Sequence, residues 1–166
     1  MKAILERRSI RKYTDEPISD QDIKELLQAA MAAPSAGNQQ PWEFIVVNDR
    51  EILNKIPEVH PYSQMLKMAP LAIIVCGNMD KERHEGYWVQ DCSAATENIL
   101  IEAQYKGLGA VWLGVYPRKE RIRGLKELFS LPENIIPLSI VSIGHPAESK
   151  EPSNRYDQSV IHINKW

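Results

Sequence analysis

The chain has 166 residues, 43% of them hydrophobic, and a formal net charge of -2 at pH 7. A chain of this length and composition buries one substantial core but not two, so we expect a single domain over residues 1–166. The small negative charge offers no concentrated basic face, which argues against nucleic acid as a partner.

Cysteine usage and the N-terminal residues favour a reducing, cytoplasmic location. Cys76 and Cys92 are the only cysteines and form no CxxC pair, so neither a disulfide framework nor a zinc site is indicated. Cys92 lies on the apolar face of a predicted helix, where we expect a buried and inert thiol. Lys2 and Glu6 have no apolar run behind them, and no stretch approaches the roughly 18 apolar residues of a membrane span. We therefore expect no export signal and no membrane partner.

The start of the chain predicts two helices. The first is short and lies around Ile4. Ser19 and Asp22 then resemble a capping box, with Asp in place of the usual Glu or Gln. Apolar residues recur every three or four positions from residue 23 to residue 31, which predicts an amphipathic helix that ends at Pro34.

The next segment predicts two buried strands with helical turns between them. Residues 44–47 and 71–75 are apolar runs rich in β-branched side chains, which is typical of buried strands. Residues 50–68 predict a short helix, a turn marked by Pro57 and Pro61, and a second short helix.

The second half continues the alternation of helices and strands. We expect a long helix, a strand, an amphipathic helix, a strand and a last short strand over residues 88–106, 110–115, 118–129, 138–143 and 160–163. This order does not require a parallel doubly wound sheet. We therefore predict the α+β class, with a central mixed, mostly antiparallel sheet flanked by helices.

A first motif combines cations with a hydroxyl. Arg7, Arg8, Ser9 and Arg11 lie within five residues of one another. Guanidinium groups and a hydroxyl suit a dianionic phosphate. The alternative is that these arginines form the solvated face of a terminal helix.

A second motif supplies amides. The segment from Pro34 to Trp42 contains Ser35 and the amides Asn38 and Gln40, and amide side chains suit the hydrogen-bonding edge of a heterocyclic ring. As an alternative, Ser35 and Asn38 are turn residues after a helix, with Gly37 at a positive φ. That alternative explains the turn but leaves the Gln-Pro-Trp sequence unexplained.

A glycine-containing segment from Gly107 to Gly114 does not predict a dinucleotide-binding loop. It lacks the third glycine of GxGxxG and precedes a predicted strand instead of joining a strand to a helix. The four histidines show no metal-ligand spacing, and neither a GxSxG nor an HExxH motif is present. We therefore expect no metal site and no hydrolase.

Together, the two N-terminal motifs resemble the nitroreductase family of FMN-dependent oxidoreductases, which has an Arg-x-Ser-x-Arg/Lys segment and a Pro-Ser-x-x-Asn-x-Gln-Pro-Trp loop. The segment Gly107–Gly114 resembles the family's Gly-Leu-Gly-x-x-Trp-x-Gly sequence. The resemblance implies an FMN-binding homodimer with two sites between subunits. It also implies ping-pong transfer of hydride from NADH or NADPH to a nitroaromatic, quinone or flavin-type acceptor.

The same resemblance implies roles for individual residues. Arg7 and Ser9 would contact the phosphate and ribityl chain, and Arg11 would approach the N1/O2 side of the ring. Ser35 and Asn38 would contact the flavin of the partner subunit. The backbone at Leu113 or Gly114 would face flavin N5. The full set of expected cofactor-binding residues is Arg7, Arg8, Ser9, Arg11, Pro34, Ser35, Asn38, Gln40, Leu113, Gly114 and Arg155.

Two other functions remain open at this point. A protein that stores or senses FMN without turnover would need the same phosphate and ring contacts. A plain interaction domain without a cofactor would tolerate the loss of Arg7 or Asn38. For the enzyme, flavin supplies the reactive atom and no protein acid or base is required.

Overall fold

A central sheet with the strand order β1-β2-β4-β3 organises the protein. The computed structural model describes residues 2–166. The strands are β1 (Trp42–Val47), β2 (Leu71–Asn78), β3 (Gly109–Gly114) and β4 (Ile135–Gly144). Neighbouring strands all pair antiparallel, and the parallel component in residues 2–166 is an isolated bridge between Ser9 and Ala110. The predicted α+β class with a mostly antiparallel sheet is confirmed.

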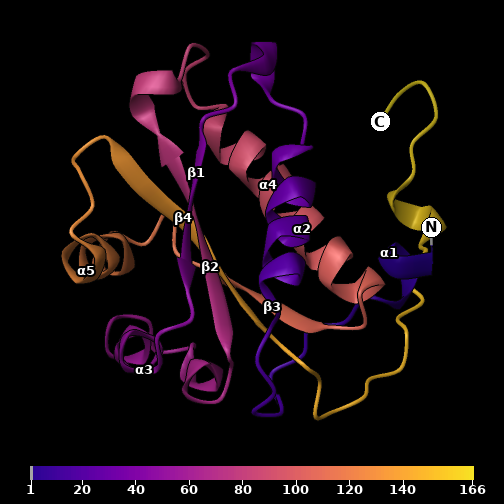
Figure 1. The fold of residues 1–166 in the computed structure, drawn as a ribbon. Helices are drawn as coiled ribbons and strands as arrows, with labels where there is room; N and C mark the ends of the chain where they lie inside the picture. Colours follow the sequence, from indigo (N-terminus) through magenta and orange to yellow (C-terminus); the bar gives the residue numbers. More distant parts are fainter. Residues whose placement is uncertain (1) are drawn as a thin grey trace.

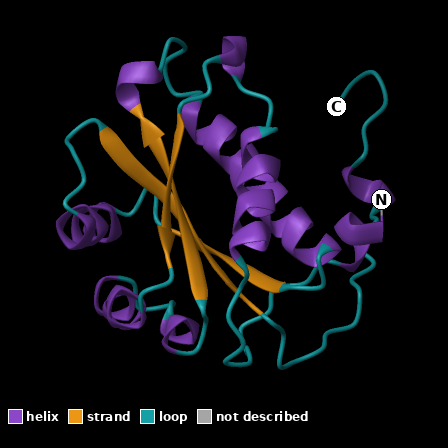
Figure 2. Ribbon diagram, viewed as in Figure 1, coloured by secondary structure: helices purple, strands orange, loops and turns teal. Residues whose placement is uncertain are grey.

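Helices cover both faces of this sheet. The helices are α1 (Lys2–Glu6), α2 (Asp20–Met31), α3 (Arg50–Val59), α4 (Trp88–Tyr105) and α5 (Lys119–Phe129). Helices α2 and α4 lie against one face, and α3 and α5 lie on the opposite side (Figures 1 and 2). The result is a three-layer arrangement in which the sheet is the middle layer.

The alternation of side chains along β2 explains why this strand is apolar throughout. Ile73 and Val75 belong to the core under α2 and α4, whereas Ala72 and Ile74 belong to the core under α3 and α5. All of these side chains are fully buried. A strand covered on both faces has no position for a solvated side chain, so its sequence is a continuous apolar run.

Local sequence signals explain several element boundaries. The Ser19 hydroxyl accepts a hydrogen bond from the Asp22 amide at 3.1 Å and caps α2 as predicted. At the end of α4, Gly107 adopts φ +74°, and the amide of Leu108 reaches back to the carbonyl of Ala103 at 2.8 Å. This is the left-handed helix termination that glycine permits.

Two expectations about secondary structure are wrong. Pro57 lies inside α3 instead of in a turn. The helix tolerates it because Pro57 is near the C-terminal end, where the missing N–H removes one hydrogen bond shortly before the helix stops. Residues 160–163 form no strand, because the C-terminal segment projects from the body and has no sheet edge beside it (Figure 1).

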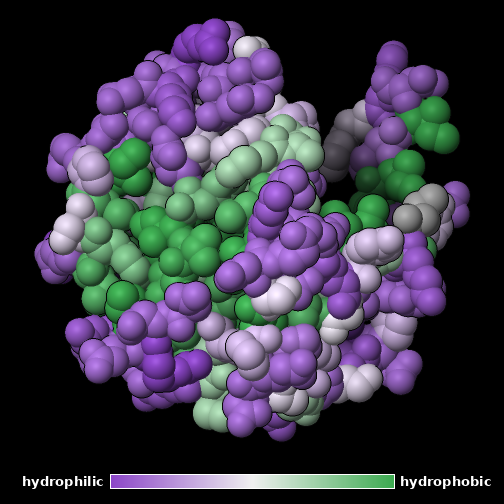
Figure 3. All heavy atoms as spheres, viewed as in Figure 1, coloured by the Kyte–Doolittle hydropathy of each residue, from purple (hydrophilic) through white to green (hydrophobic). Residues whose placement is uncertain are grey.

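Further features of the structure bear on function. Cys92 is fully buried, as expected, and burial raises the pKa of its thiol. Within residues 2–166, no group of three or more His, Cys, Asp or Glu side chains could hold a metal ion. None of the helices in this range is both long and apolar enough to cross a membrane. Figure 3 shows apolar side chains (green) on the projecting C-terminal segment, which includes Val160 and Ile163 at 71% and 81% exposure.

Candidate functional site

Both ends of the chain contribute to a cavity lined with cations. This cavity, of about 250 Å³, is lined by Arg7, Arg8, Ser9, Arg11, Lys150 and Arg155, which we call the cation cluster. The ammonium of Lys150 donates a hydrogen bond to the backbone carbonyl of Ser9 at 2.6 Å. This contact ties the C-terminal segment to the N-terminal motif, so the cluster is assembled from residues about 140 positions apart in the chain.

Carboxylates neutralise only part of the cluster. Arg7 Nε lies 3.3 Å from Glu97 Oε1, and Lys150 Nζ lies 3.2 Å from Glu148 Oε1. Glu148 also accepts a hydrogen bond from the backbone amide of Arg11, at 2.6 Å, and this bond holds the pKa of its carboxyl below the ordinary value. Because the cations outnumber these acids, the cavity suits an anion that accepts several charge-assisted hydrogen bonds, such as a phosphate.

A second and larger cavity adjoins the cation cluster at Arg11. Its volume is about 570 Å³, and its wall combines Arg11 with Trp112, Leu113 and Gly114 from β3 and with Arg121 from α5. The rest of the wall is formed by His60, Pro61, Tyr62, Gln64 and Met65. Because Arg11 lines both cavities, a ligand with an anionic group at one end and a planar group at the other could occupy both.

The backbone of β3 presents polar groups to this larger cavity. Strand β3 is at the edge of the sheet, and the amide of Val115 donates to the carbonyl of Leu138 at 3.0 Å. In an antiparallel pair, hydrogen-bonded and non-hydrogen-bonded residues alternate. The peptide groups of Leu113 are therefore directed to β4, whereas the N–H and C=O of Gly114 point away from it.

Gly114 also leaves room beside the strand. A Cβ built on Gly114 would have nothing within 4 Å. The position therefore offers a free face of backbone on which a planar ring can lie, next to an N–H that points in the cavity direction. These features fit the ring of FMN, and the cation cluster fits its phosphate.

Residues 34–40, which we call the amide loop, have an unusual backbone. Gly37, Asn38 and Gln40 have φ values of +52°, +53° and +47°. Within the loop, the Ser35 hydroxyl accepts from the Gln40 amide at 3.0 Å, and the side chain of Gln40 donates to that of Asn38 at 3.1 Å. A left-handed conformation at two non-glycine residues is costly and requires support from the surrounding structure.

That support comes from Gln39 and Asp91, both only 4% exposed. The Asp91 carboxylate accepts hydrogen bonds from the Ala36 amide at 2.9 Å and from the Gln39 side chain at 2.6 Å. The Gln39 oxygen in turn accepts from the amides of Arg83 and His84, at 2.8 and 3.1 Å. The loop is thus held from beneath by buried polar contacts, while Asn38 and Gln40 remain exposed.

The expected site residues divide between the two adjoining cavities and the amide loop. Arg7, Arg8, Ser9, Arg11 and Arg155 meet in the cation cluster, and Leu113 and Gly114 line the adjoining cavity with Arg11. Pro34, Ser35, Asn38 and Gln40 line neither cavity.

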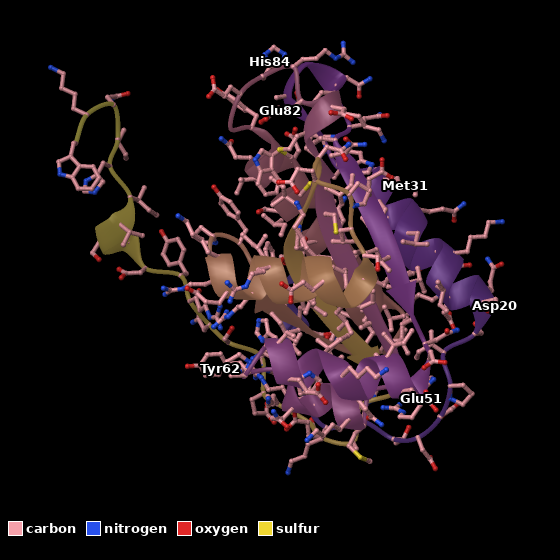
Figure 4. All side chains as sticks on the ribbon, turned by 90° about the vertical axis from the view of Figure 1, so that its left-hand side faces the viewer. Asp20, Met31, Glu51, Tyr62, Glu82 and His84 are labelled. Atoms are coloured by element: carbon pink, nitrogen blue, oxygen red, sulfur yellow. The ribbon has the colours of Figure 1, made fainter. Side chains whose placement is uncertain are left out.

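The amide loop and the larger cavity are far apart in the folded molecule. A Cβ on Gly37 would overlap the imidazole of His84, so His84 marks the position of the loop. Tyr62 marks the larger cavity. Figure 4 places these two side chains at opposite ends of the molecule.

Sequence reasoning missed several residues of the site. Lys150 precedes Arg155 in the same polar segment, and this proximity was a usable signal. Asp91 was a second signal, because it is a carboxylate on the apolar face of α4, between the buried residues Trp88 and Cys92. His60 and Arg121 carried no local signal, since they meet β3 only through the tertiary fold.

Comparison with known proteins extends these observations. The model of the nitroreductase family matches residues 4–60 and 57–145. A protein of Archaeoglobus fulgidus, provisionally named an NADH dehydrogenase/NAD(P)H nitroreductase, is 53% identical over 170 residues, covering 100% of this chain and 98% of that protein.

Solved structures agree over nearly the full length. A Clostridium acetobutylicum structure, provisionally described as an NADH oxidase, has a TM-score of 0.96 at 48% identity and covers 99% of each chain. A Desulfovibrio desulfuricans structure, provisionally named a nitroreductase and solved in complex with FMN, has a TM-score of 0.86 at 31% identity. It covers 99% of this chain and 96% of that one.

Proposed function

This chain belongs to the nitroreductase family, and from that premise we propose that it is an FMN-dependent oxidoreductase. It takes a hydride from NADH or NADPH and reduces a nitroaromatic, quinone or flavin-type acceptor by a ping-pong mechanism. The observation that carries this proposal is the junction at Arg11 of a cation-lined cavity with a larger cavity walled by strand backbone.

The phosphate end of the site is supported by charge. The cavity at this end is lined by the cations Arg7, Arg8, Arg155 and Lys150 and also by Ser9. Charge-assisted hydrogen bonds from guanidinium groups to a phosphate are stronger than neutral ones and fix its orientation. The glutamates beside Arg7 and Lys150 limit repulsion among these cations before a phosphate binds.

The ring end of the site is supported by backbone geometry. FMN, when bound, supplies the atom that accepts hydride and later gives up electrons. The N–H of Gly114 would donate to the hydrogen-bonding edge of the ring, and Arg11, which lines the same cavity, would place a positive charge beside the ring and favour its anionic reduced form. No side chain of this chain has to act as an acid or a base.

A homodimer accounts for the distance between the amide loop and the larger cavity. Pro34, Ser35, Asn38 and Gln40 contact the flavin of the partner subunit in this proposal, because they lie away from the cavity of their own chain. The projecting C-terminal segment carries exposed apolar side chains, which would be buried by packing against a second copy of the chain. We place this single-domain protein in the cytoplasm.

The visible spectrum tests the proposal directly. Purified protein is supplemented with FMN, desalted, and examined before and after anaerobic addition of NADH or NADPH. The proposal predicts retained flavin bands that bleach. Retained bands that do not bleach would favour a flavin storage or sensing protein, and absence of retained flavin would overturn the assignment.

Two substitutions test the site residues. Arg7→Ala removes a phosphate contact, and Asn38→Ala removes an amide contact from the partner subunit. Both should release FMN, whereas unchanged flavin content in both would contradict the proposed contacts. Sedimentation of the wild-type protein measures the dimer independently of flavin.

A further inference from the structure

The carbonyl oxygen of Gly114 receives two hydrogen bonds from outside the sheet. His60 Nε2 lies 2.9 Å from this oxygen, and a guanidinium nitrogen of Arg121 lies 2.6 Å from it. His60 follows α3 directly, and Arg121 is in the first turn and a half of α5. Two elements that are distant in the sequence therefore converge on one peptide group at the end of β3.

The contact defines the tautomer of His60. Because a carbonyl oxygen only accepts hydrogen bonds, Nε2 must carry the proton. The imidazole is 1% exposed, and its Nδ1 has no hydrogen-bond partner within residues 2–166. Ser63 donates to the His60 carbonyl through both its amide and its hydroxyl, at 3.1 and 2.7 Å. Among residues 2–166, the buried ring thus makes its one polar contact to Gly114.

Arg121 is fixed by a second contact. Its guanidinium carbon lies 5.3 Å from the centre of the Tyr62 ring, in a cation–π arrangement. Tyr62 projects at the periphery of the molecule in Figure 4, and both residues line the larger cavity. The arginine therefore bridges the cavity wall and the end of the strand.

We propose that His60 and Arg121 are positioning residues that hold the Gly114 carbonyl, and thereby aim the N–H of Gly114 at the ring of FMN. This inference rests on the proposed function. Glycine has little intrinsic conformational preference, and at the edge of a sheet it has no neighbouring strand to hold its outer groups. The two donors replace that missing strand.

The donors also change the electrostatics of the cavity wall. An unpaired carbonyl on the same side as the Gly114 N–H would present a lone pair to the oxygen and nitrogen acceptors at the edge of the ring. A carbonyl oxygen has two lone pairs, and the hydrogen bonds from His60 and Arg121 occupy both of them. The strand end then presents donors, and not an acceptor, to the cofactor.

The test compares removal of each donor with matched controls. His60→Leu and Arg121→Met remove a donor, whereas His60→Gln retains an amide donor near the position of Nε2. Arg123→Met is the control on the same helix, since Arg123 is exposed and lines a different surface. Arg121 is only partly buried, so Arg121→Met keeps the fold and carries the test if His60→Leu does not fold.

Two readouts are measured. The first is hydrogen exchange of the Val115 amide in the protein without FMN, which should become about tenfold faster when either donor is lost, because the strand end opens more often. The second is the rate constant for reduction of bound FMN by NADH, which should fall by roughly tenfold to a hundredfold because the ring is misplaced. His60→Gln should restore both, and Arg123→Met should change neither.

The outcomes separate this inference from the proposed function. If the wild-type protein binds no FMN or is not reduced, the proposed function fails, while the exchange measurement still reports on the carbonyl contacts. If wild-type FMN is reduced and both donor-free variants keep the wild-type rate constant, the positioning role is overturned and the proposed function stands. Faster exchange with an unchanged rate constant would likewise limit both residues to a structural role.

Discussion

The amide loop and the cation cluster obtain their order from different sources. The loop stands on Gln39 and Asp91, which are buried and hydrogen-bonded to backbone amides, so its shape is set before any ligand arrives. The cation cluster consists of partly or fully exposed side chains of like charge, with ion pairs at its rim. One region is therefore ordered by the protein interior, whereas we expect the other to be completed by a bound anion.

Removal of the buried carboxylate should have the largest effect. Asp91→Ala leaves the Ala36 amide and the Gln39 side chain without a charged acceptor, which should lower the free energy of unfolding by about 3 kcal/mol. Urea denaturation of the protein without FMN measures this change. Glu97→Ala is the control on the same helix, where the ion pair is partly exposed. A loss below about 1 kcal/mol for Asp91→Ala would show that the loop does not depend on its buried support.

Loss of a cation should weaken FMN binding and cost less stability than loss of Asp91, because the contacts of Lys150 with Ser9 and Glu148 are only partly buried. Lys150→Ala should raise the dissociation constant of FMN by about tenfold or more, since a charged hydrogen bond contributes about 1.5–3 kcal/mol. Fluorescence quenching of FMN measures the affinity, and the difference from wild type should shrink as salt is added. Lys55→Ala, at an exposed position of α3, should bind as wild type. If Lys150→Ala lowered the free energy of unfolding as much as Asp91→Ala does, the contrast between the two regions would be contradicted.

A backbone substitution should reveal how tightly the amide loop is packed. Gly37→Ala places a side chain at φ +52° and against the His84 imidazole, so stability should fall by about 1 kcal/mol or more. Gly86→Ala is a matched control, because Gly86 has φ +81° with nothing near its Cβ position. Thermal unfolding of both variants separates the conformational cost from the steric cost. If Gly86→Ala loses as much as Gly37→Ala, the contact with His84 is unimportant.

The smallest change should appear as a pH dependence. Burial holds the pKa of His60 below its ordinary value of 6.5, and the nearby charge of Arg121 adds to this effect. As pH falls below 6.5, the unfolded chain binds a proton that the folded protein does not bind, so stability decreases until the lowered pKa is reached. His60→Gln should flatten this part of the profile in urea denaturation, and His162→Gln, at an exposed position, should not. Parallel profiles for wild type and His60→Gln would contradict the prediction.

Sequence predicted what depends on neighbours in the chain. The Ser19 cap and the apolar run of β2 were found because each is decided by residues within a few positions. Residues 160–163 have the β-branched composition of a strand, but a strand also needs a partner edge, and none is present beside the projecting segment. Pro57 was wrongly assigned to a turn, because tertiary packing decides where α3 ends and therefore whether Pro57 lies before or after that end.

The candidate site divides along the same line. Arg7, Ser9 and Arg11 could be proposed together because they are contiguous, whereas Lys150 joins them only through the path of the C-terminal segment. His60 had to be found in the structure, because its role depends on which peptide groups of β3 face outward. That direction follows from pairing register, which a single sequence does not specify.

Peptide groups along β3 point alternately toward β4 and away from it, so the register of β3 decides which backbone atoms face the larger cavity. A slip of one residue against β4 would turn the Gly114 N–H toward the sheet and bring a neighbouring peptide group to the cavity instead. Every side chain of the site would still be present in the sequence. Among homologues, an insertion or deletion between Gly109 and Gly114 therefore changes the atom offered to a ligand, while many substitutions there leave that atom in place.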